Sequence, residues 1–213
     1  MPAPPDPVLL YHITHLDNLP GILGAGCLHC QQQLGDAGLH PVSIAYPGIQ
    51  DRRLITQVPC GPGGVLHDYV PYYFAPRSPM LYAIHKNRVE AYDEGQTPIV
   101  HLVSSVPQIQ TTNHQFVFTD GHATMAFTHF FTETDDLDQI DWPLMRATYW
   151  HDTQQDPDRK RRRQAEFLVY NTVNISALLG IGVINEHVQQ RVEHLLRTHQ
   201  VELPVRTRRN WYY

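Results

Sequence analysis

The chain has 213 residues, of which 42% are hydrophobic and 17% are charged, and its formal net charge at pH 7 is −5. This length predicts one globular domain with a buried core at residues 8–213, preceded by a flexible leader at residues 1–7 that holds four prolines. The negative charge argues against a protein that binds nucleic acids through its overall charge, although it leaves room for a local basic tract.

No stretch approaches 18 consecutive apolar residues, and the N-terminus lacks a signal-peptide pattern. We therefore expect a cytoplasmic protein without a membrane partner. Three cysteines indicate reduced thiols rather than a disulfide framework. Cys27 and Cys30 have the spacing of half a zinc site, but no second pair completes it, so we expect no metal.

In the first half of the chain, residues 8–13 predict a strand and residues 16–23 a short helix. Residues 31–48 carry little periodicity and predict a long surface loop. Residues 49–55 predict one or two helical turns that carry Arg52 and Arg53. Residues 68–74 predict an aromatic strand, although Pro71 argues against a central place in a sheet.

Further along, Ser78 and Pro79 predict the start of a helix that continues to residue 85. Residues 98–104 and 115–119 predict strands, and a packed helix is expected around residues 125–131. Residues 137–150 are expected to be helical in part. Asn185 is a candidate N-cap for the clearest amphipathic helix, and residues 201–205 predict a last strand. This irregular mixture of strands and helices favours an α+β fold.

One segment joins a basic run to a strand. Five consecutive cations, Arg159, Lys160, Arg161, Arg162 and Arg163, lead into a strand-forming run that begins at Glu166. A carboxylate at the mouth of a core strand is partly desolvated and held still, which suits a group that binds a substrate hydroxyl or stabilises a developing cation. The alternative is a Glu166 that simply pairs with a neighbouring arginine at the surface.

Two His-x-Thr tripeptides, His12 to Thr14 and His122 to Thr124, resemble the paired signature of the 2H phosphoesterases. In that family two histidines act as acid and base on a cyclic phosphate, and both tripeptides lie in strands. Here the second tripeptide follows an Asp-Gly turn. A 2H-type cyclic phosphoesterase, with no use of NAD+ or of Glu166, is therefore an alternative function.

More of the chain resembles the DarT family, bacterial toxins that have an ADP-ribosyltransferase fold and modify DNA. The resemblance runs in order through Tyr11-His12-Ile13-Thr14, Arg52-Arg53, the aromatic strand leading to Ser78-Pro79-Met80-Leu81-Tyr82, Asp120-Gly121-His122-Ala123, the Glu166 strand and Asn210-Trp211-Tyr212-Tyr213. It implies an ADP-ribosyltransferase-like α+β fold, with a mixed β-sheet core and surrounding helices. It also implies a toxin that transfers ADP-ribose from NAD+ to thymine in single-stranded DNA, with a macrodomain antitoxin as its partner.

The resemblance implies roles for individual residues. Cleavage of the bond between nicotinamide and ribose passes through an oxocarbenium-like state, and Glu166 is the candidate carboxylate. Arg53, with Arg52 as the second choice, would contact the pyrophosphate and help to orient the acceptor. His122 would take the proton from the thymine nitrogen as the new bond forms. The further candidates for binding NAD+ are His12, Thr14, Tyr73, Met80 and Tyr82.

The basic run from Arg159 to Arg163 would then contact DNA phosphates beside the reacting base. Single strands are the natural acceptor, because the pairing edge of a base is hidden inside a duplex. A transferase of the same fold that modifies protein or RNA is a nearer alternative than the phosphoesterase. A catalytically silent nucleic-acid-binding module is the remaining one.

Overall fold

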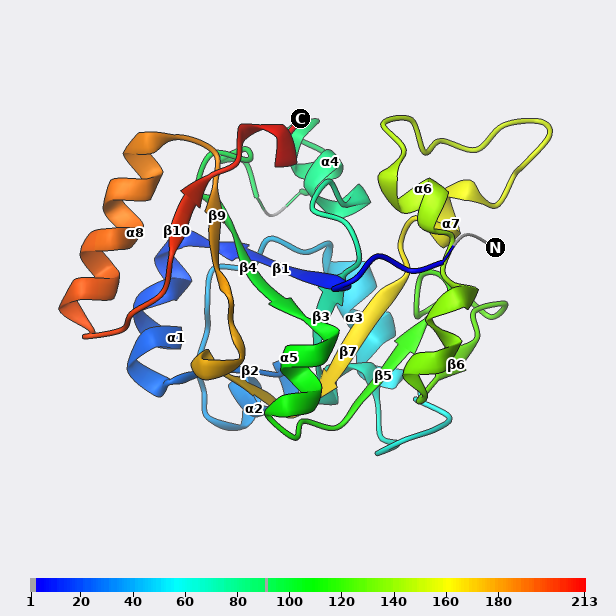
Figure 1. The fold of residues 1–213 in the computed structure, drawn as a ribbon, viewed down its shortest axis with the longest axis horizontal. Helices are drawn as coiled ribbons and strands as arrows, with labels where there is room; N and C mark the ends of the chain where they lie inside the picture. The colour runs from blue at the N-terminus through cyan, green and yellow to red at the C-terminus, as the bar shows by residue number, and fades with distance from the viewer. Residues whose placement is uncertain (1–2, 91) are drawn as a thin grey trace.

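A mixed sheet forms the centre of the protein in the computed structural model, which describes residues 3–90 and 92–213 (Figure 1). Its eight strands follow the order β10-β9-β4-β1-β3-β7-β5-β6, and a second sheet pairs β2 with β8. Strands β9 and β10 are parallel, whereas β1 pairs antiparallel with both β3 and β4. The strands are β1 Leu9–His15, β2 Cys27–His29, β3 Tyr69–Tyr73, β4 Ile99–Ser105, β5 Phe116–Thr119, β6 Phe130–Phe131, β7 Glu166–Tyr170, β8 Thr172–Asn174, β9 Gly180–Val183 and β10 Val205–Thr207.

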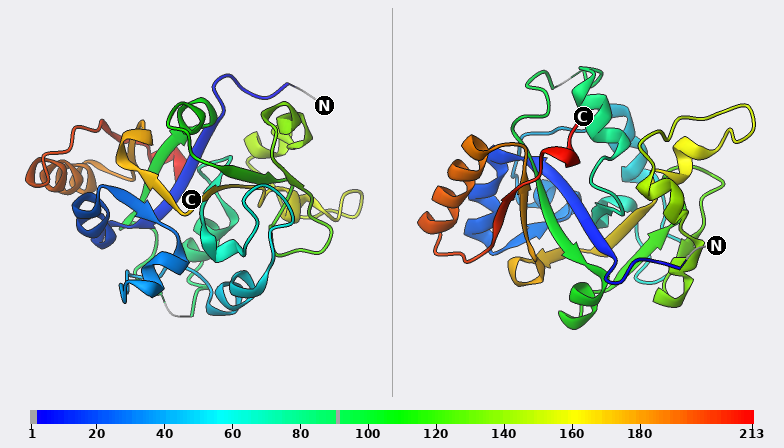
Figure 2. Two further views of the ribbon diagram at one scale, coloured as in Figure 1. Left: turned by 90° about the horizontal axis from the view of Figure 1, so that it is seen from below. Right: turned by 45° about the horizontal axis from the view of Figure 1, so that its top comes forward.

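Short helices surround this sheet, as expected for the predicted α+β class. The α-helices are α1 Leu19–Ala25, α2 Gln31–Asp36, α3 Pro47–Ile55, α4 Pro79–His85, α5 Val106–Thr111, α6 Trp142–Arg146, α7 Arg159–Arg162 and α8 Glu186–Thr198. The 3-10 helices are η1 Leu16–Asn18, η2 Leu66–Asp68, η3 Thr134–Gln139, η4 Ile175–Ala177 and η5 Arg209–Trp211. Helices α1 and α8 lie side by side at one end of the molecule, while α6 and α7 lie at the other, near the start of β7 (Figures 1 and 2).

Different contacts pack the helices against the two ends of the sheet. At the α8 end, the Asn185 side chain accepts a hydrogen bond from the Val188 amide and so caps the helix, as predicted. Val188 and Val192 on its apolar face are buried in the main core. At the opposite end, the rings of Phe74 and Trp142 meet edge to face with centroids 5.5 Å apart. This second contact anchors α6 to the end of β3.

Strand β3 lies in the middle of the sheet, although Pro71 argued against that position. It pairs with β7 along its whole length, but with β1 only at Tyr11 and Tyr73. On the β1 side, the His12 imidazole takes the place of a ladder bond, because its Nδ1 lies 2.8 Å from the Pro71 carbonyl oxygen. The carbonyl of Pro71 therefore has a side-chain partner on the side where the backbone ladder with β1 is absent.

Three other expectations for the elements were wrong. The predicted loop at residues 31–48 contains α2 and the start of α3, so only residues 37–46 lack a helix. No helix forms around residues 125–131, where Phe127 is exposed and β6 begins at Phe130. The last strand is Val205–Thr207 rather than residues 201–205. Residues 3–7 of the predicted leader are exposed and have no helix or strand, and residues 1 and 2 lie outside the described part.

Candidate active site

Glu166 and Arg53 form a buried ion pair at the end of an interior strand of the central sheet. Arg53 Nη1 lies 2.7 Å from Glu166 Oε2, and the two residues are 7% and 5% exposed. Glu166 is the first residue of β7, opposite Tyr73 of β3, and Arg53 lies in the last turn of α3. A cation is favoured at the carboxyl end of a helix, so α3 presents Arg53 to the carboxylate at little electrostatic cost.

Two further hydrogen bonds hold Glu166 in place, one at its carboxylate and one at its backbone amide. The Ala123 amide donates a hydrogen bond to Oε1 over 3.1 Å. The Glu166 amide donates to Thr119 Oγ1, also over 3.1 Å. Each carboxylate oxygen therefore has one donor, and lone pairs remain that can accept a substrate hydroxyl.

The two adjacent arginines differ sharply in their surroundings. Arg53 is buried, and its Nη2 atom has no hydrogen-bond partner among the described residues. Arg52 is exposed, and its Nε donates to the Gly48 carbonyl within the same helix. Since a buried unpaired guanidinium nitrogen costs free energy unless something binds it, Arg53 is the better placed of the two to meet a ligand.

His122 lies in the turn after β5, and its ring is held by the residue two positions later. Its Nδ1 accepts a hydrogen bond from the Thr124 amide at 3.2 Å and lies 3.0 Å from the Thr124 hydroxyl oxygen. Because a backbone amide can only donate, the neutral ring carries its proton on Nε2. Burial lowers the pKa of His122, and the positive charges of Arg53, Arg52 and Lys160 act in the same direction against Glu166. The second tripeptide thus lies outside any strand, unlike the 2H pattern.

These side chains line a single cavity of about 1250 Å³. Residues 39–50 form one wall of it. The wall is attached through Asn18, whose side chain bonds both the amide and the carbonyl of Val42, at 2.8 and 3.0 Å. Of the predicted site residues, the cavity is lined by Glu166, Arg53, His122, His12, Thr14, Tyr73, Met80, Tyr82 and Lys160.

His12 and Thr14 enter the cavity from β1. The bond from His12 Nδ1 to the Pro71 carbonyl leaves the Nε2 lone pair as the second hydrogen-bonding site of the ring. Burial lowers the pKa of His12, so the ring is neutral at pH 7. Thr14 is buried, and its hydroxyl accepts a hydrogen bond from Asn18 over 3.0 Å.

Tyr73, Met80 and Tyr82 form a second, aromatic side of the cavity. The Tyr73 hydroxyl lies 3.7 Å from Met80 Sδ, and burial raises the pKa of Tyr73. Tyr82 meets Tyr213 edge to face at 5.0 Å. The Tyr213 hydroxyl in turn accepts from Trp150 Nε1 at 3.1 Å and donates to the Arg77 carbonyl at 3.0 Å. Tyr213 therefore supports this side from behind.

The basic run is a single helical turn whose arginines are largely used within the protein. Arg161 pairs with Asp158 at 2.7 Å and with Asp120 at 3.0 Å, which lowers the pKa of Asp158. Arg162 pairs with Asp141 at 2.9 Å and also with Asp156.

The two remaining arginines of the run bind main-chain carbonyls. Arg159 donates to the carbonyls of Tyr149 and His151. Arg163 is 4% exposed and donates to the carbonyls of Leu144, Met145 and Arg77, and burial lowers its pKa to about 10. Within the described part of the chain, Lys160 is the member of the run whose charged group has neither an ion pair nor a hydrogen-bond partner, and Lys160 lines the cavity.

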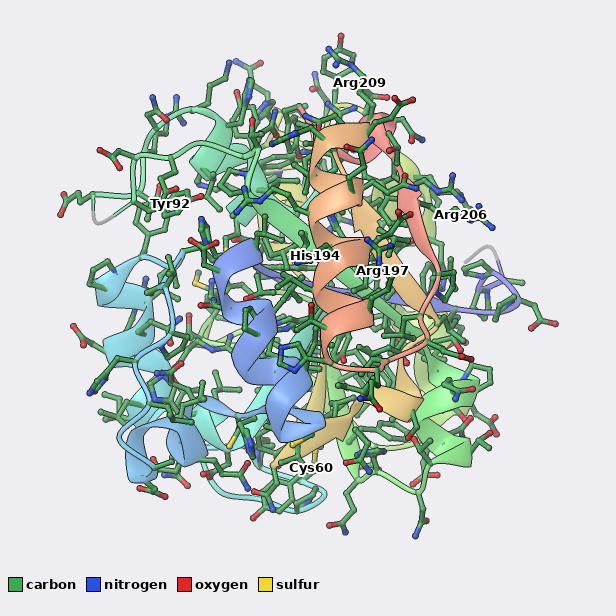
Figure 3. The ribbon with its side chains drawn as sticks, turned by 90° about the vertical axis from the view of Figure 1, so that its left-hand side faces the viewer. Cys60, Tyr92, His194, Arg197, Arg206 and Arg209 are labelled. Atoms are coloured by element: carbon green, nitrogen blue, oxygen red, sulfur yellow. The ribbon has the colours of Figure 1, made fainter. Side chains whose placement is uncertain are left out.

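The other features of the sequence differ in their relation to this site, because the arginines near the end of the sequence lie apart from it, whereas Cys27 and Cys30 line its cavity. Arg206 and Arg209 project at the surface near α8 (Figure 3) and do not line the cavity. Cys27, Cys30 and Cys60 are free thiols. In residues 3–90 and 92–213, no three His, Cys, Asp or Glu side chains are grouped so as to hold a metal ion, and no helix is long and apolar enough to cross a bilayer.

Sequence reasoning missed the parts of the site that come from the backbone and from segments without a pattern. The wall at residues 39–50 and the Asn18 side chain carry no motif, and the motif that contains Ala123 does not show that its backbone amide bonds Glu166. Gly121 gave only a turn signal. A Cβ at this position would clash with the Arg161 side chain, so glycine is what permits that side chain to lie across the turn.

Comparison with known proteins gives one consistent match. The family model described as "ssDNA thymidine ADP-ribosyltransferase, DarT" matches residues 11–213. A DNA ADP-ribosyl transferase of Thermus sp. (strain 2.9) is 44% identical over 98% of this chain and 98% of its own length.

Two solved structures of Thermus sp. 2.9 DarT also match. The complex with ADP-ribosylated single-stranded DNA has a TM-score of 0.92 at 43% identity, and it covers 100% of this chain and 99% of that one. The complex with NAD+ has a TM-score of 0.88 at 40% identity, covering 99% and 100%. A more distant Thermosipho africanus protein, a fusion of a DNA ADP-ribosyl transferase with a DNA ADP-ribosyl glycohydrolase, is 24% identical over 90% of this chain and 46% of the fusion.

Proposed function

The chain belongs to the DarT family of single-stranded DNA thymidine ADP-ribosyltransferases, and we propose that Glu166, Arg53 and His122 carry out its transfer of ADP-ribose from NAD+ to thymine. The observation that supports this assignment is the buried pair of Arg53 and Glu166 on the wall of a cavity of about 1250 Å³. The relatives' complexes with NAD+ and with ADP-ribosylated single-stranded DNA favour this activity over a cyclic phosphoesterase.

Glu166 supplies the negative charge for bond cleavage. The bond between ribose C1″ and nicotinamide breaks with its electron pair leaving on nicotinamide, so positive charge develops on the ribose. The carboxylate is held by Ala123 and Arg53 and has lone pairs left for a ribose hydroxyl. A group fixed in this way stabilises the developing charge without having to reorganise.

Arg53 contributes the second, unpaired face of its guanidinium. Nη1 is occupied by Glu166, whereas Nη2 is buried without a partner among the described residues. Nη2 can therefore donate to a phosphate or to a carbonyl of the acceptor base, and the fixed fork holds that ligand beside the carboxylate. Arg52, exposed on the same helix, serves the donor only as a more distant positive charge.

His122 assists as a hydrogen-bond donor, and not as the base that the family resemblance implies. Its Nδ1 lone pair is used by the Thr124 amide, so the neutral ring offers Nε2–H. As the thymine ring nitrogen bonds to C1″, its proton passes to solvent water, and the negative charge that builds up on the base before the new bond is complete is shared with the neighbouring carbonyl oxygens. A donor at one of these oxygens lowers the energy of that state.

The rest of the cavity holds the donor molecule. His12 and Thr14 present hydrogen-bonding groups for a ribose or for the nicotinamide amide, and Tyr73, Met80 and Tyr82 form an apolar, aromatic wall for the nicotinamide ring. Lys160 is the cation of the basic run that contacts a DNA phosphate, because the four arginines already have partners within the protein. The reaction is a glycosyl transfer, since the new bond forms at ribose carbon rather than at phosphorus.

The partners follow from the activity and from the relatives. A toxin of this kind acts in the cytoplasm, where NAD+ and chromosomal DNA are both present. The Thermosipho africanus fusion supports a partner enzyme that removes the modification, and we assign that role to a macrodomain antitoxin.

The proposal is tested by intact mass spectrometry of short single-stranded oligonucleotides, with or without thymine, after incubation with the protein and NAD+. We expect a mass gain of one ADP-ribose on thymine-containing strands alone, and none with Glu166→Ala. Modification that persists in this variant would contradict the role of Glu166, and intact oligonucleotides with unconsumed NAD+ would contradict the activity.

A further inference from the structure

Most of the exposed apolar side chains of this protein either line the cavity or lie close in the sequence to residues that line it. In the described ranges, 3–90 and 92–213, the large apolar side chains that are exposed are Leu39, Val42, Leu54, Ile55, Met125, Phe127, Tyr149 and Leu179. Leu39 and Val42 line the cavity themselves. Leu54 and Ile55 directly follow Arg53 in the sequence, and Tyr149 directly precedes Trp150. Met125 and Phe127 lie in the loop that follows His122. Arg53, His122 and Trp150 all line the cavity. Leu179 is the exception.

Phe127 is exposed on a loop that is well held. The ends of the loop are joined by Asp120, which accepts hydrogen bonds from the His129 amide at 3.0 Å and pairs with its ring at 2.8 Å. Inside the loop, the Thr128 hydroxyl donates to the His122 carbonyl over 2.8 Å. These hydrogen bonds fix the conformation of the loop, and in this conformation the Phe127 ring is 79% exposed.

Tyr149 is presented in a comparable way on the other segment that meets α7. Its carbonyl accepts a hydrogen bond from Arg159 Nη2 at 2.9 Å, while its ring is 80% exposed. The next residue, Trp150, is buried and donates to the Tyr213 hydroxyl. Arg161 of the same helix bonds Thr128 of the Phe127 loop over 3.3 Å. The two exposed rings therefore sit on segments that are both attached to α7.

The bases of a single-stranded DNA acceptor are suitable ligands for these two rings. Its bases are not stacked in a duplex, and an exposed aromatic ring can stack on any of them. The unpaired ammonium of Lys160 lies on the same helix, so a phosphate contact is available beside the rings. Isolated surface apolar residues need no explanation, but two exposed aromatic rings on segments that are both attached to α7, beside Lys160 at the cavity, are typical of a binding surface.

We propose that Phe127 and Tyr149 stack on the nucleobases that flank the modified thymine, and that they set the affinity of the enzyme for its acceptor strand. This inference rests on the proposed function, because the strand they contact is the one that is modified.

The test is a set of steady-state measurements on Phe127→Ala, Tyr149→Ala and the control Leu179→Ala, which removes an exposed apolar side chain away from the cavity. Two acceptors are compared: a short strand with one thymine between adenines, and the same strand with abasic sites in place of the flanking adenines. We expect each aromatic variant to raise KM for the first strand roughly fivefold or more, because stacking on one base contributes at least this much. KM for NAD+ and kcat should stay within about twofold, since neither ring contacts the donor.

The abasic strand separates stacking from a general loss of binding. The wild type should show a raised KM on it, and the aromatic variants should add little to that increase, whereas Phe127→Trp should behave as the wild type on both strands. Equal KM values for Phe127→Ala, Tyr149→Ala and Leu179→Ala would overturn the inference, as would an equal penalty on both strands. If the wild type modifies no thymine strand, the proposed function fails. Fluorescence anisotropy with the same two strands then still decides whether the rings stack.

Discussion

Arg53 Nη1 donates to Glu166 Oε2 over 2.7 Å across a separation of 113 residues, and Arg53 Nη2 has no partner in the described part of the chain. The pair therefore has two uses at once. One half of the guanidinium fixes the carboxylate, and the other half is kept for a ligand. Because both side chains are buried, changing either residue affects the stability of the protein as well as its chemistry.

Glu166→Gln should abolish transfer to thymine strands, with a loss of roughly a hundredfold or more, because an amide cannot stabilise the positive charge on the ribose. Glu166→Ala should in addition destabilise the fold by about 3 kcal/mol, since Arg53 is left buried without its partner. Mass spectrometry of the oligonucleotide and urea unfolding measure the two effects. The exposed Glu202→Gln is the matched control and should change neither.

The two neighbouring arginines should respond differently to the same substitution. Arg53→Lys should reduce kcat/KM at least about tenfold, because a single ammonium cannot bond Glu166 and a ligand in the geometry of the planar fork. Arg52→Lys should stay within about threefold of the wild type, since Arg52 is exposed and bonds only the Gly48 carbonyl. Equal losses in the two variants would contradict the assignment of Arg53.

His122→Gln should retain more transfer than His122→Ala if the ring acts as a donor, because the glutamine amide still offers an N–H. If the ring instead removed the proton, both variants would be equally slow. The KM for NAD+ should be similar in the two variants. This comparison decides between the two roles directly.

Transfer by the wild type should be insensitive to pH from about 8 down to about 6.5 and should decline below that. Burial lowers the pKa of His122, so the ring stays neutral across this range. Protonation at lower pH would place a hydrogen on Nδ1, facing the Thr124 amide, and the ring would lose its present position. A pH–rate profile of kcat/KM checks this. In His122→Gln the decline assigned to the ring should be absent.

The affinity for single-stranded DNA should depend only weakly on salt. Each phosphate contact contributes about −0.7 to the slope of log K against log salt for a single strand. With Lys160 as the main contact, and Arg52 as a second, we expect a slope between about −0.7 and −1.4. Contacts from all five cations of the run would give about −3.5 instead. Fluorescence anisotropy over a salt series, with Lys160→Gln as the comparison, measures this slope.

Stability should fall in mild acid because of His101, which is fully buried and packs on Tyr212. Burial lowers the pKa of His101 from 6.5 to about 4. Between these two values the unfolded chain binds a proton that the folded chain does not, so stability is lost as pH falls through this window, by roughly 3 kcal/mol. Urea unfolding at pH 7.5 and 4.5 should show a smaller change for His101→Gln than for the wild type. The exposed His187→Gln should match the wild type.

Much of the fold could be predicted because its signals were local. Ser78 and Asn185 cap their helices by accepting a hydrogen bond from a backbone amide three residues later, as predicted. The strand that begins at Glu166 was predicted from its apolar run. The packed helix expected near residue 125 failed for a physical reason. Its apolar residues have helical spacing, but the bonds between Asp120 and His129 close the segment into a loop.

For the candidate site, the sequence predicted a set of residues but not their geometry. Glu166, Arg53 and His122 were identified through a family resemblance, and the structure places all three on one cavity. The arginines of the basic run looked like a free phosphate-binding tract, because nothing in the sequence shows that Asp120 and Asp141 lie within reach of Arg161 and Arg162. Contacts between residues far apart in the chain decide which charges remain available.

The position of Tyr213 behind Tyr82 has a consequence for synthesis of the protein. Its hydroxyl bonds the carbonyl of Arg77, 136 residues earlier, and Trp150. The aromatic side of the cavity is therefore unsupported until the ribosome has passed Tyr213 and this segment has left the exit tunnel. A nascent chain that already contains Glu166 and Arg53 would still lack its finished cavity, which delays the onset of NAD+ consumption until translation of this segment is over.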